Sequence, residues 1–159
     1  MKHILIPTDF SIQSLRVVHH AVETFGAEPL SITLMHALHM PASIMDLMML
    51  SRRSAHYDLI TPDYKDACEI IRNRYASSIK EMKTAFLMGD TNGVFRNFLL
   101  YHNIDAIVCA ENNAFRAAGT DSYNPARLIK NSKYPVHYMP LTPRKGKLMV
   151  SVMSELFEI

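Results

Sequence analysis

The stretch His3-Ile4-Leu5-Ile6-Pro7-Thr8-Asp9-Phe10-Ser11 predicts the fold of this chain. Its apolar run is typical of a strand that is covered on both faces of a sheet. Ser11 is a good N-cap for a helix that begins at once. In an α/β domain, ligands bind at the carboxyl edge of the sheet, where the strand order reverses. We therefore expect the first strand to deliver Asp9 to that edge.

The rest of the chain alternates between helical patterns and apolar runs. Gly26 is expected to end the first helix as a C′ glycine. A second helix should start at Thr61-Pro62 and run to about Met82, and residues 40–60 could form a short helix or a packed loop. The further strands are expected at 31–37, 84–88, 106–110 and 134–139. This alternation predicts a five-stranded parallel sheet with helices on both faces.

Composition excludes several classes of protein. The 159 residues are 48% hydrophobic and 20% charged, which suits one globular domain, and the net charge of +2 argues against nucleic-acid or anionic-membrane binding. The only cysteines, Cys68 and Cys109, have no CxxC spacing, so neither a disulfide framework nor a zinc site is indicated. The most apolar window, 40–50, is too short to span a membrane. We expect a cytoplasmic protein with reduced thiols.

The chain is expected to divide into a main domain and an extension. Residues 1–142 contain all the expected strands, and residues 143–159 follow the fifth one. The extension has too many apolar residues for a solvated tail. We expect it to pack on the domain or on a second copy of the chain.

Three segments resemble the universal stress protein family, of the UspA type. They are HILIPTDFS (3–11), GDTNGVFRNFLLYHNIDAIVCAENN (89–113) and ARLIKNSKYPVHYMP (126–140). The resemblance covers roughly residues 2–140. It implies an α/β domain like that of the adenine nucleotide alpha hydrolases, with strand order 3-2-1-4-5. Strands one and four are then neighbours, and the expected crevice lies between Asp9 and the loop after Ala110.

The glycine motif of the ATP-binding members is degenerate in this chain. Those members carry Gly, two residues, Gly, nine residues, and then Gly-Ser or Gly-Thr after the fourth strand. Such glycines let backbone N–H groups approach phosphates closely. Here the corresponding positions are Ala110, Asn113 and about Ser122-Tyr123, and Gly119 is out of register. The resemblance therefore implies a protein that is not a standard ATP binder.

The adenine side of the implied site is better preserved. Asp9 matches the family's acidic residue at the end of strand one, although a turn residue that satisfies backbone N–H groups explains it equally well. Ala37 lies where binders place a residue whose backbone contacts the base. ATP, AMP or adenosine are the candidate ligands. The candidate site residues are Pro7, Thr8, Asp9, Ser11, Ala37, Ala110, Asn112, Asn113 and Ser122.

Other chemical readings of single residues are weaker. His36 and His39 are three apart, but no helix aligns them, so a surface or interface pair is favoured over a metal site. Ser11 has no histidine close in sequence to activate it, and helix capping explains it. The segment 111–113 could supply ligand contacts, although a solvated loop is slightly favoured. The sequence therefore predicts neither a metal ion nor a catalytic residue.

The first functional hypothesis is a stress-response or regulatory protein that acts by binding rather than by catalysis. The resemblance implies a homodimer through strand five, with Val136, Tyr138 and Met139 and with the C-terminal extension. The second hypothesis is an adenine nucleotide or nucleoside binder with an altered phosphate loop and a weak ATPase activity. A flavodoxin-like electron-transfer domain is disfavoured, because no phosphate-binding turn follows the first strand.

Overall fold

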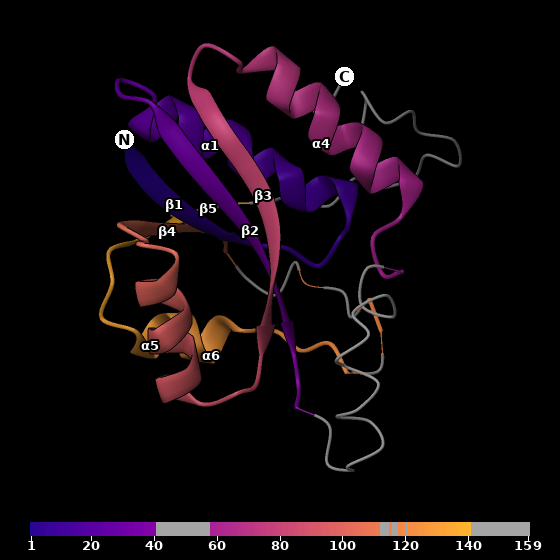
Figure 1. The fold of residues 1–159 in the computed structure, drawn as a ribbon, viewed down its shortest axis with the longest axis vertical. Helices are drawn as coiled ribbons and strands as arrows, with labels where there is room; N and C mark the ends of the chain where they lie inside the picture. Colours follow the sequence, from indigo (N-terminus) through magenta and orange to yellow (C-terminus); the bar gives the residue numbers. More distant parts are fainter. Residues whose placement is uncertain (41–57, 112–114, 116–117, 120, 141–159) are drawn as a thin grey trace.

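Five parallel strands form one sheet in the order β3-β2-β1-β4-β5, which confirms the expected order (Figure 1). The structure is a computed structural model that describes residues 1–40, 58–111, 115, 118–119 and 121–140. The expectations for residues 41–57 and for the extension therefore lie outside the described residues. The strands are β1 (Lys2–Pro7), β2 (Leu30–Leu38), β3 (Ile79–Met88), β4 (Ala106–Ala110) and β5 (Val136–Met139).

Helices cover both faces of the sheet. They are α1 (Arg16–Phe25), α4 (Pro62–Arg74), α5 (Asn92–Tyr101) and α6 (Ala126–Asn131), and a 3-10 turn η1 (Ile12–Leu15) precedes α1. Figure 1 shows α1 and α4 on one side of the sheet and α5 and α6 on the other. Among the described helices, none is both long and apolar enough to cross a membrane.

Two apolar clusters hold these layers together. Ile4 and Ile6 of β1 are buried in the cluster under α1 and α4, whereas Leu5 is buried in the cluster under α5 and α6. Successive side chains of a strand point to opposite faces, so the continuous apolar run supplies both clusters. The central strand is thereby fixed on both sides, and its carboxyl end is held in a defined place.

Polar side chains fix the helix starts at this end of the sheet. Ser11, Thr61 and Thr91 each accept a hydrogen bond from the backbone N–H three residues further on, at 3.3, 3.1 and 3.2 Å. Such caps satisfy N–H groups that have no partner within the helix. The predicted capping by Ser11 and the predicted helix start at Thr61-Pro62 are confirmed.

The predicted extent of the second helix is wrong. That helix, α4, ends at Arg74, and Ile79 and Met82 belong to β3 instead. The pairing register between β2 and β3 shifts by one residue after Ile79, because Lys80 is an extra residue there. The shift lets Ile79 and Met82, three residues apart, enter the same apolar cluster. Buried residues three apart, which are typical of a helix, therefore lie here on an irregular strand.

Gly26 ends α1 as expected, but for a different reason. Its φ is −68°, which any residue can adopt, so a left-handed C′ conformation is not what requires glycine. A Cβ atom at this position would lie 2.3 Å from the carbonyl oxygen of Val22. Glycine is required here because the chain passes so close to the last turn of the helix.

Candidate functional site

A cavity of about 270 Å³ lies at the carboxyl ends of β1 and β4. It is bordered by the start of the helical segment after β1 on one side and by the start of α6 on the other. This is the position where the strand order reverses, and such positions are where open α/β sheets bind ligands. Its lining residues are Pro7, Thr8, Asp9, Ser14, Val17, Cys109, Ala110, Phe115, Asn124, Pro125, Ala126, Ile129 and Tyr138.

Two hydrogen bonds orient the Asp9 side chain at this edge. Its side chain is 6% exposed, and its Oδ1 accepts hydrogen bonds from the backbone N–H of Ser11 at 2.9 Å and from the Ser11 hydroxyl at 2.5 Å. A carboxylate that accepts hydrogen bonds from the residue two positions later in the chain closes an Asx turn. Ser11 in turn caps η1. Ser11 therefore supports Asp9 and the helix start, and it is not among the lining residues of the cavity.

A chain of hydroxyl groups lies behind Asp9. The Ser14 hydroxyl donates to the Ser11 carbonyl at 2.6 Å, and Thr8 Oγ1 lies 2.8 Å from Ser14 Oγ and 3.0 Å from the Tyr64 hydroxyl. The Ser14 hydroxyl donates its one proton to the Ser11 carbonyl, so Thr8 must donate to Ser14. Since the Thr8 proton is then used, Tyr64 must donate to Thr8. Burial is the main influence on the Tyr64 hydroxyl and raises the pKa of Tyr64 well above its ordinary value. The Ser14, Thr8 and Tyr64 hydroxyls are thus linked in one chain of hydrogen bonds behind Asp9.

His36 closes the other side of the β1 end. Its Nδ1 lies 2.9 Å from the Thr8 carbonyl oxygen and its Nε2 lies 2.7 Å from Ser122 Oγ. A carbonyl can only accept, so Nδ1 carries the proton and Nε2 accepts from the Ser122 hydroxyl. Burial is the main influence on the ring and lowers the pKa of His36. The Phe10 ring stacks on it at 4.3 Å between centroids. His36 is therefore a neutral, fully bonded core residue.

Some of the candidate residues from the sequence meet at the cavity. Pro7, Thr8, Asp9 and Ala110 line it. Ala37 is 1% exposed and belongs to the apolar cluster under α5 and α6, and Ser122 is bonded to His36. Asn112 and Asn113 lie outside the described residues.

Sequence reasoning missed most of the other lining residues. Ser14 and Val17 start the first helical segment, Cys109 immediately precedes the identified Ala110, and Tyr138 was assigned only to a dimer interface. Strand ends and helix starts were the available signal, because both border the carboxyl edge in this class of fold. That signal does not show which of these residues face the cavity, so only the structure identifies the residues of its walls.

Neither cysteine offers a reactive thiolate. Burial raises the pKa of Cys109 to about 11, and burial also raises the pKa of Cys68 to about 11. The thiol at the cavity wall is thus protonated at neutral pH and poorly nucleophilic. Across the described part of the chain, no group of three or more His, Cys, Asp or Glu residues could hold a metal ion.

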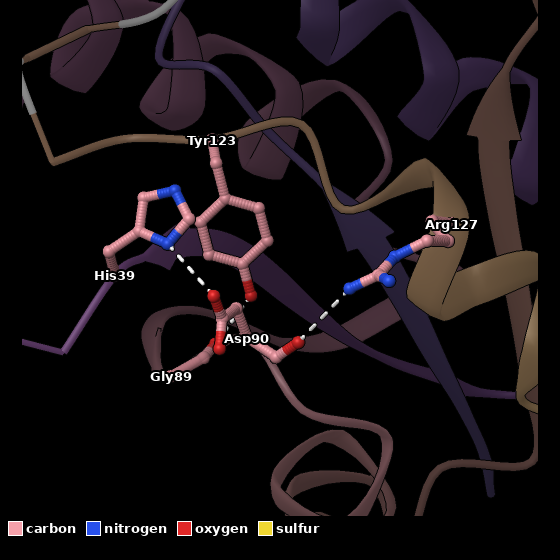
Figure 2. A network of polar contacts seen from close by, with 5 residues as sticks. All are labelled: His39, Gly89, Asp90, Tyr123 and Arg127. Carbon is pink, nitrogen blue, oxygen red and sulfur yellow. Dashed lines mark hydrogen bonds and ion pairs between the residues drawn. The ribbon is translucent and has the colours of Figure 1, made fainter.

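A polar network outside the cavity holds the segment that leads into α6 (Figure 2). The Tyr123 hydroxyl donates to the Gly89 carbonyl, and Arg127 Nη2 donates to the Asp90 carbonyl at 3.5 Å. His39 Nδ1 lies 3.2 Å from Asp90 Oδ2, and its ring lies against Tyr123. The network joins the ends of β2 and β3 to residues 123–127. It therefore supports the wall formed by residues 124–126.

Comparison with known proteins identifies the class of fold. No protein-family model matches the chain, and no curated protein sequence matches it. A universal stress protein solved in complex with cAMP is similar in structure, with a TM-score of 0.55, 17% identity, and coverage of 89% of this chain and 98% of that one. UspA from Lactobacillus plantarum has a TM-score of 0.54 and 20% identity, and the match covers 87% of this chain and 97% of UspA.

A third solved structure agrees with these two. It is a protein of the universal stress protein family from Burkholderia pseudomallei, with a TM-score of 0.51, 15% identity, and coverage of 87% of this chain and 96% of that one. At these identities the likeness concerns the fold. The chain has the fold of the universal stress proteins.

Proposed function

We propose that this protein is a universal stress protein-like regulator that acts by binding a small molecule in the cavity between β1 and β4. The observation that carries the proposal is the position of the cavity. It lies where the strand order reverses, and the buried Asp9 carboxyl is in its wall. The Thr8 and Ser14 hydroxyls in its wall are bonded to each other, which supports binding rather than catalysis. We also propose that the protein is cytoplasmic, and that residues 1–142 form the main domain and residues 143–159 an extension.

The residues at the family's glycine positions argue against ATP bound in the way that the family's ATP-binding members hold it. Ala110 occupies the first glycine position, and the Ser122 hydroxyl near the last one is bonded to the buried His36. A hydroxyl in that bond is not available to a phosphate. These two positions therefore argue against the family's usual phosphate contacts at Ala110 and Ser122.

Binding can be tested on the purified protein. The protein is denatured, the supernatant is separated on a nucleotide-resolving column, and intact protein is titrated with ATP, AMP, cAMP and adenosine by calorimetry. A bound compound or a binding isotherm with 1:1 stoichiometry is the expected result. Absence of both, with the protein folded, would contradict an adenine-compound site.

A cavity-filling variant locates any binding that is seen. Ala126 is exposed and lines the cavity, so Ala126→Leu narrows the cavity at little cost in stability. We expect it to weaken binding at least tenfold. Lys130→Leu is the matched control, because Lys130 is exposed on the same helix and does not line the cavity. Equal affinities in the two variants would place the ligand elsewhere.

A second candidate is an adenine nucleotide binder with slow ATPase activity. The structural neighbour solved with cAMP favours it, because that protein shares this fold and holds an adenine nucleotide. Release of phosphate from ATP that scales with protein concentration and is lost in Asp9→Ala would support it. The same rate in Asp9→Ala would remove this site from the reaction.

We further propose a homodimer through β5 and the C-terminal extension. β5 lies at one edge of the sheet formed by the described strands, and Tyr138 on it is 49% exposed. An exposed edge presents unpaired N–H and C=O groups, which native proteins cover. Light scattering should give twice the monomer mass, and deletion of residues 144–159 should lower the mass or the solubility. A monomer whose solubility is unchanged by the deletion would contradict this interface.

A further inference from the structure

We propose that Tyr123 is a positioning residue of the cavity, whose hydroxyl group holds the wall formed by residues 124–126 in place. Tyr123 itself is not among the described residues that line the cavity. It immediately precedes three that do, namely Asn124, Pro125 and Ala126. The role rests on the small-molecule function proposed above, and it makes ligand affinity depend on a side chain that the ligand does not touch.

The chain before this wall lies against the carboxyl end of β2. The Tyr123 N–H donates to the Ala37 carbonyl at 3.2 Å. The His39 N–H donates to the Asp121 carbonyl at 2.9 Å. An antiparallel bridge lies between these two bonds. The backbone of residues 121–123 is therefore fixed to β2, one strand away from the β1 and β4 ends that border the cavity.

The Tyr123 side chain adds a contact to the end of β3 (Figure 2). Its hydroxyl donates to the carbonyl oxygen of Gly89, the residue that follows β3. Gly89 is itself fixed to β2, because its N–H donates to the Leu38 carbonyl at 2.8 Å. Its φ is +122°, a conformation that residues with a side chain rarely adopt. The acceptor therefore has a defined position, and Tyr123 is bound through its backbone to β2 and through its hydroxyl to the residue after β3.

The Tyr123 hydroxyl remains a donor at neutral pH. Burial is the main influence on it and, together with the Asp90 charge, raises the pKa of Tyr123 to about 12. A carbonyl can only accept, so the bond to Gly89 requires the protonated phenol. The His39 ring lies 4.4 Å from the Tyr123 ring between centroids. This ring contact supports the orientation in which the hydroxyl reaches Gly89.

The turn between Tyr123 and α6 is constrained, so it transmits this position to the wall. Asn124 Oδ1 accepts from the Ala126 N–H at 3.1 Å, and such a bond two residues on closes an Asx turn. Pro125 lies between them with φ −81°, an angle that its ring restricts. A displacement of Tyr123 would therefore shift the three wall residues together rather than be absorbed in the turn.

The test compares two variants that each replace a tyrosine with phenylalanine. Tyr123→Phe removes the hydroxyl and keeps the ring against His39. Tyr75→Phe is the matched control, because its hydroxyl is bonded to His19 on α1 and Tyr75 is not among the described lining residues. Calorimetry measures the affinity for whichever of ATP, AMP, cAMP and adenosine binds the wild-type protein most tightly. We expect Tyr123→Phe to weaken binding about threefold to tenfold, as the loss of one neutral hydrogen bond would, and Tyr75→Phe to leave it unchanged.

Chemical denaturation separates positioning from general destabilisation. Tyr123 and Tyr75 are both half-buried, and each variant loses one hydrogen bond of a hydroxyl group. Their free energies of unfolding should therefore fall by similar amounts, although only Tyr123→Phe loses affinity. A loss of affinity in both variants that follows their loss of stability would overturn the positioning role.

Amide hydrogen exchange in the wild-type protein gives an independent measurement. Coupling between two sites is reciprocal, so a ligand that depends on Tyr123 must in turn stabilise the bonds of Tyr123. The bound compound should slow exchange of the Tyr123 and His39 N–H groups more than that of the Tyr75 N–H, which donates to the Ile71 carbonyl at 3.1 Å. The excess should match the factor by which Tyr123→Phe weakens binding. Equal slowing of all three amides would overturn the coupling.

The outcomes separate this role from the proposed function. If the wild-type protein binds one of the four compounds and Tyr123→Phe binds it with the same affinity, the positioning role is wrong and the binding function stands. If none of the four binds the folded wild-type protein at millimolar concentration, the proposed adenine-compound site fails, and the positioning role fails with it.

Discussion

The two sides of the β1 carboxyl end are built from neighbouring residues but differ in packing. Toward β2, the Phe10 ring fills the space against His36, Tyr64 and Phe86, and it is 5% exposed. Toward β4, the chain leaves a cavity of about 270 Å³. Thr8 takes part in both sides, through its carbonyl to His36 and through its place in the cavity wall.

This difference supports placing the proposed function on the side toward β4. The side toward β2 has every described polar group paired and every ring packed, so it behaves as core. The side toward β4 keeps an acidic group and open space together, which a core would normally avoid. Variants on the two sides should therefore affect different quantities, namely stability toward β2 and ligand binding toward β4.

The largest effect on stability is expected at Phe10. Its φ is +63°, an unusual conformation for a bulky residue. Phe10→Ala should lower the free energy of unfolding by about 3 kcal/mol, because a buried aromatic ring is lost. Phe10→Gly should cost roughly 0.5–1 kcal/mol less than Phe10→Ala, because glycine adopts a positive φ without strain. Chemical denaturation measures both, and a glycine variant no more stable than the alanine variant would contradict the strain.

An intermediate effect is expected from the protonation of His36. Burial lowers the pKa of His36 in the folded protein, so the unfolded chain binds its proton more readily. The stability contribution is then complete above the ordinary pKa of about 6.5 and is lost as the pH falls below it, by at most about 1.4 kcal/mol per pH unit. The loss stops once the pH passes below the folded-state pKa.

His36→Asn isolates this effect, because asparagine can donate to the Thr8 carbonyl and does not titrate. Denaturation of both proteins from pH 8 to pH 5 should give a difference in stability that is constant above about pH 7 and narrows below pH 6.5. A difference that stays constant through this range would mean that His36 does not couple folding to protons.

The smallest effect is expected at the surface pair of Figure 2. The His39 and Asp90 side chains are 49% and 54% exposed. Exposed ion pairs contribute about 0–1 kcal/mol. Asp90→Asn should therefore change the free energy of unfolding by less than about 1 kcal/mol and leave ligand affinity unchanged. A larger loss would show that the network of Tyr123 and Arg127 depends on this carboxylate.

The sequence predicts much of the fold because β1 satisfies several local rules at once. Its apolar run, the acidic residue at its end and the Ser11 cap all agree with an α/β start, and the structure confirms the strand order. The β2–β3 irregularity could not be predicted, because the extra residue at Lys80 is defined only by its pairing with another strand.

The candidate site is only partly predictable for the same reason. Asp9 and Ala110 follow from strand ends, which are local features. The bond between His36 and Ser122 joins residues 86 positions apart, and nothing in the sequence near either one indicates it. The assignment of Ser122 to a ligand came from its place in the family's glycine motif, and the assignment of His36 to a surface pair came from its spacing to His39. The structure instead buries His36 and bonds the two residues to each other.

Tyr138 belongs at once to the edge strand and to the cavity wall. A chain that pairs with β5 would therefore touch an element that also touches a bound ligand. Thermodynamic linkage makes such an effect reciprocal: if association changes the ligand's dissociation constant by some factor, the ligand changes the association constant by the same factor. A single tyrosine would then let the concentration of a metabolite set the degree of assembly, and protein concentration set the apparent affinity for that metabolite.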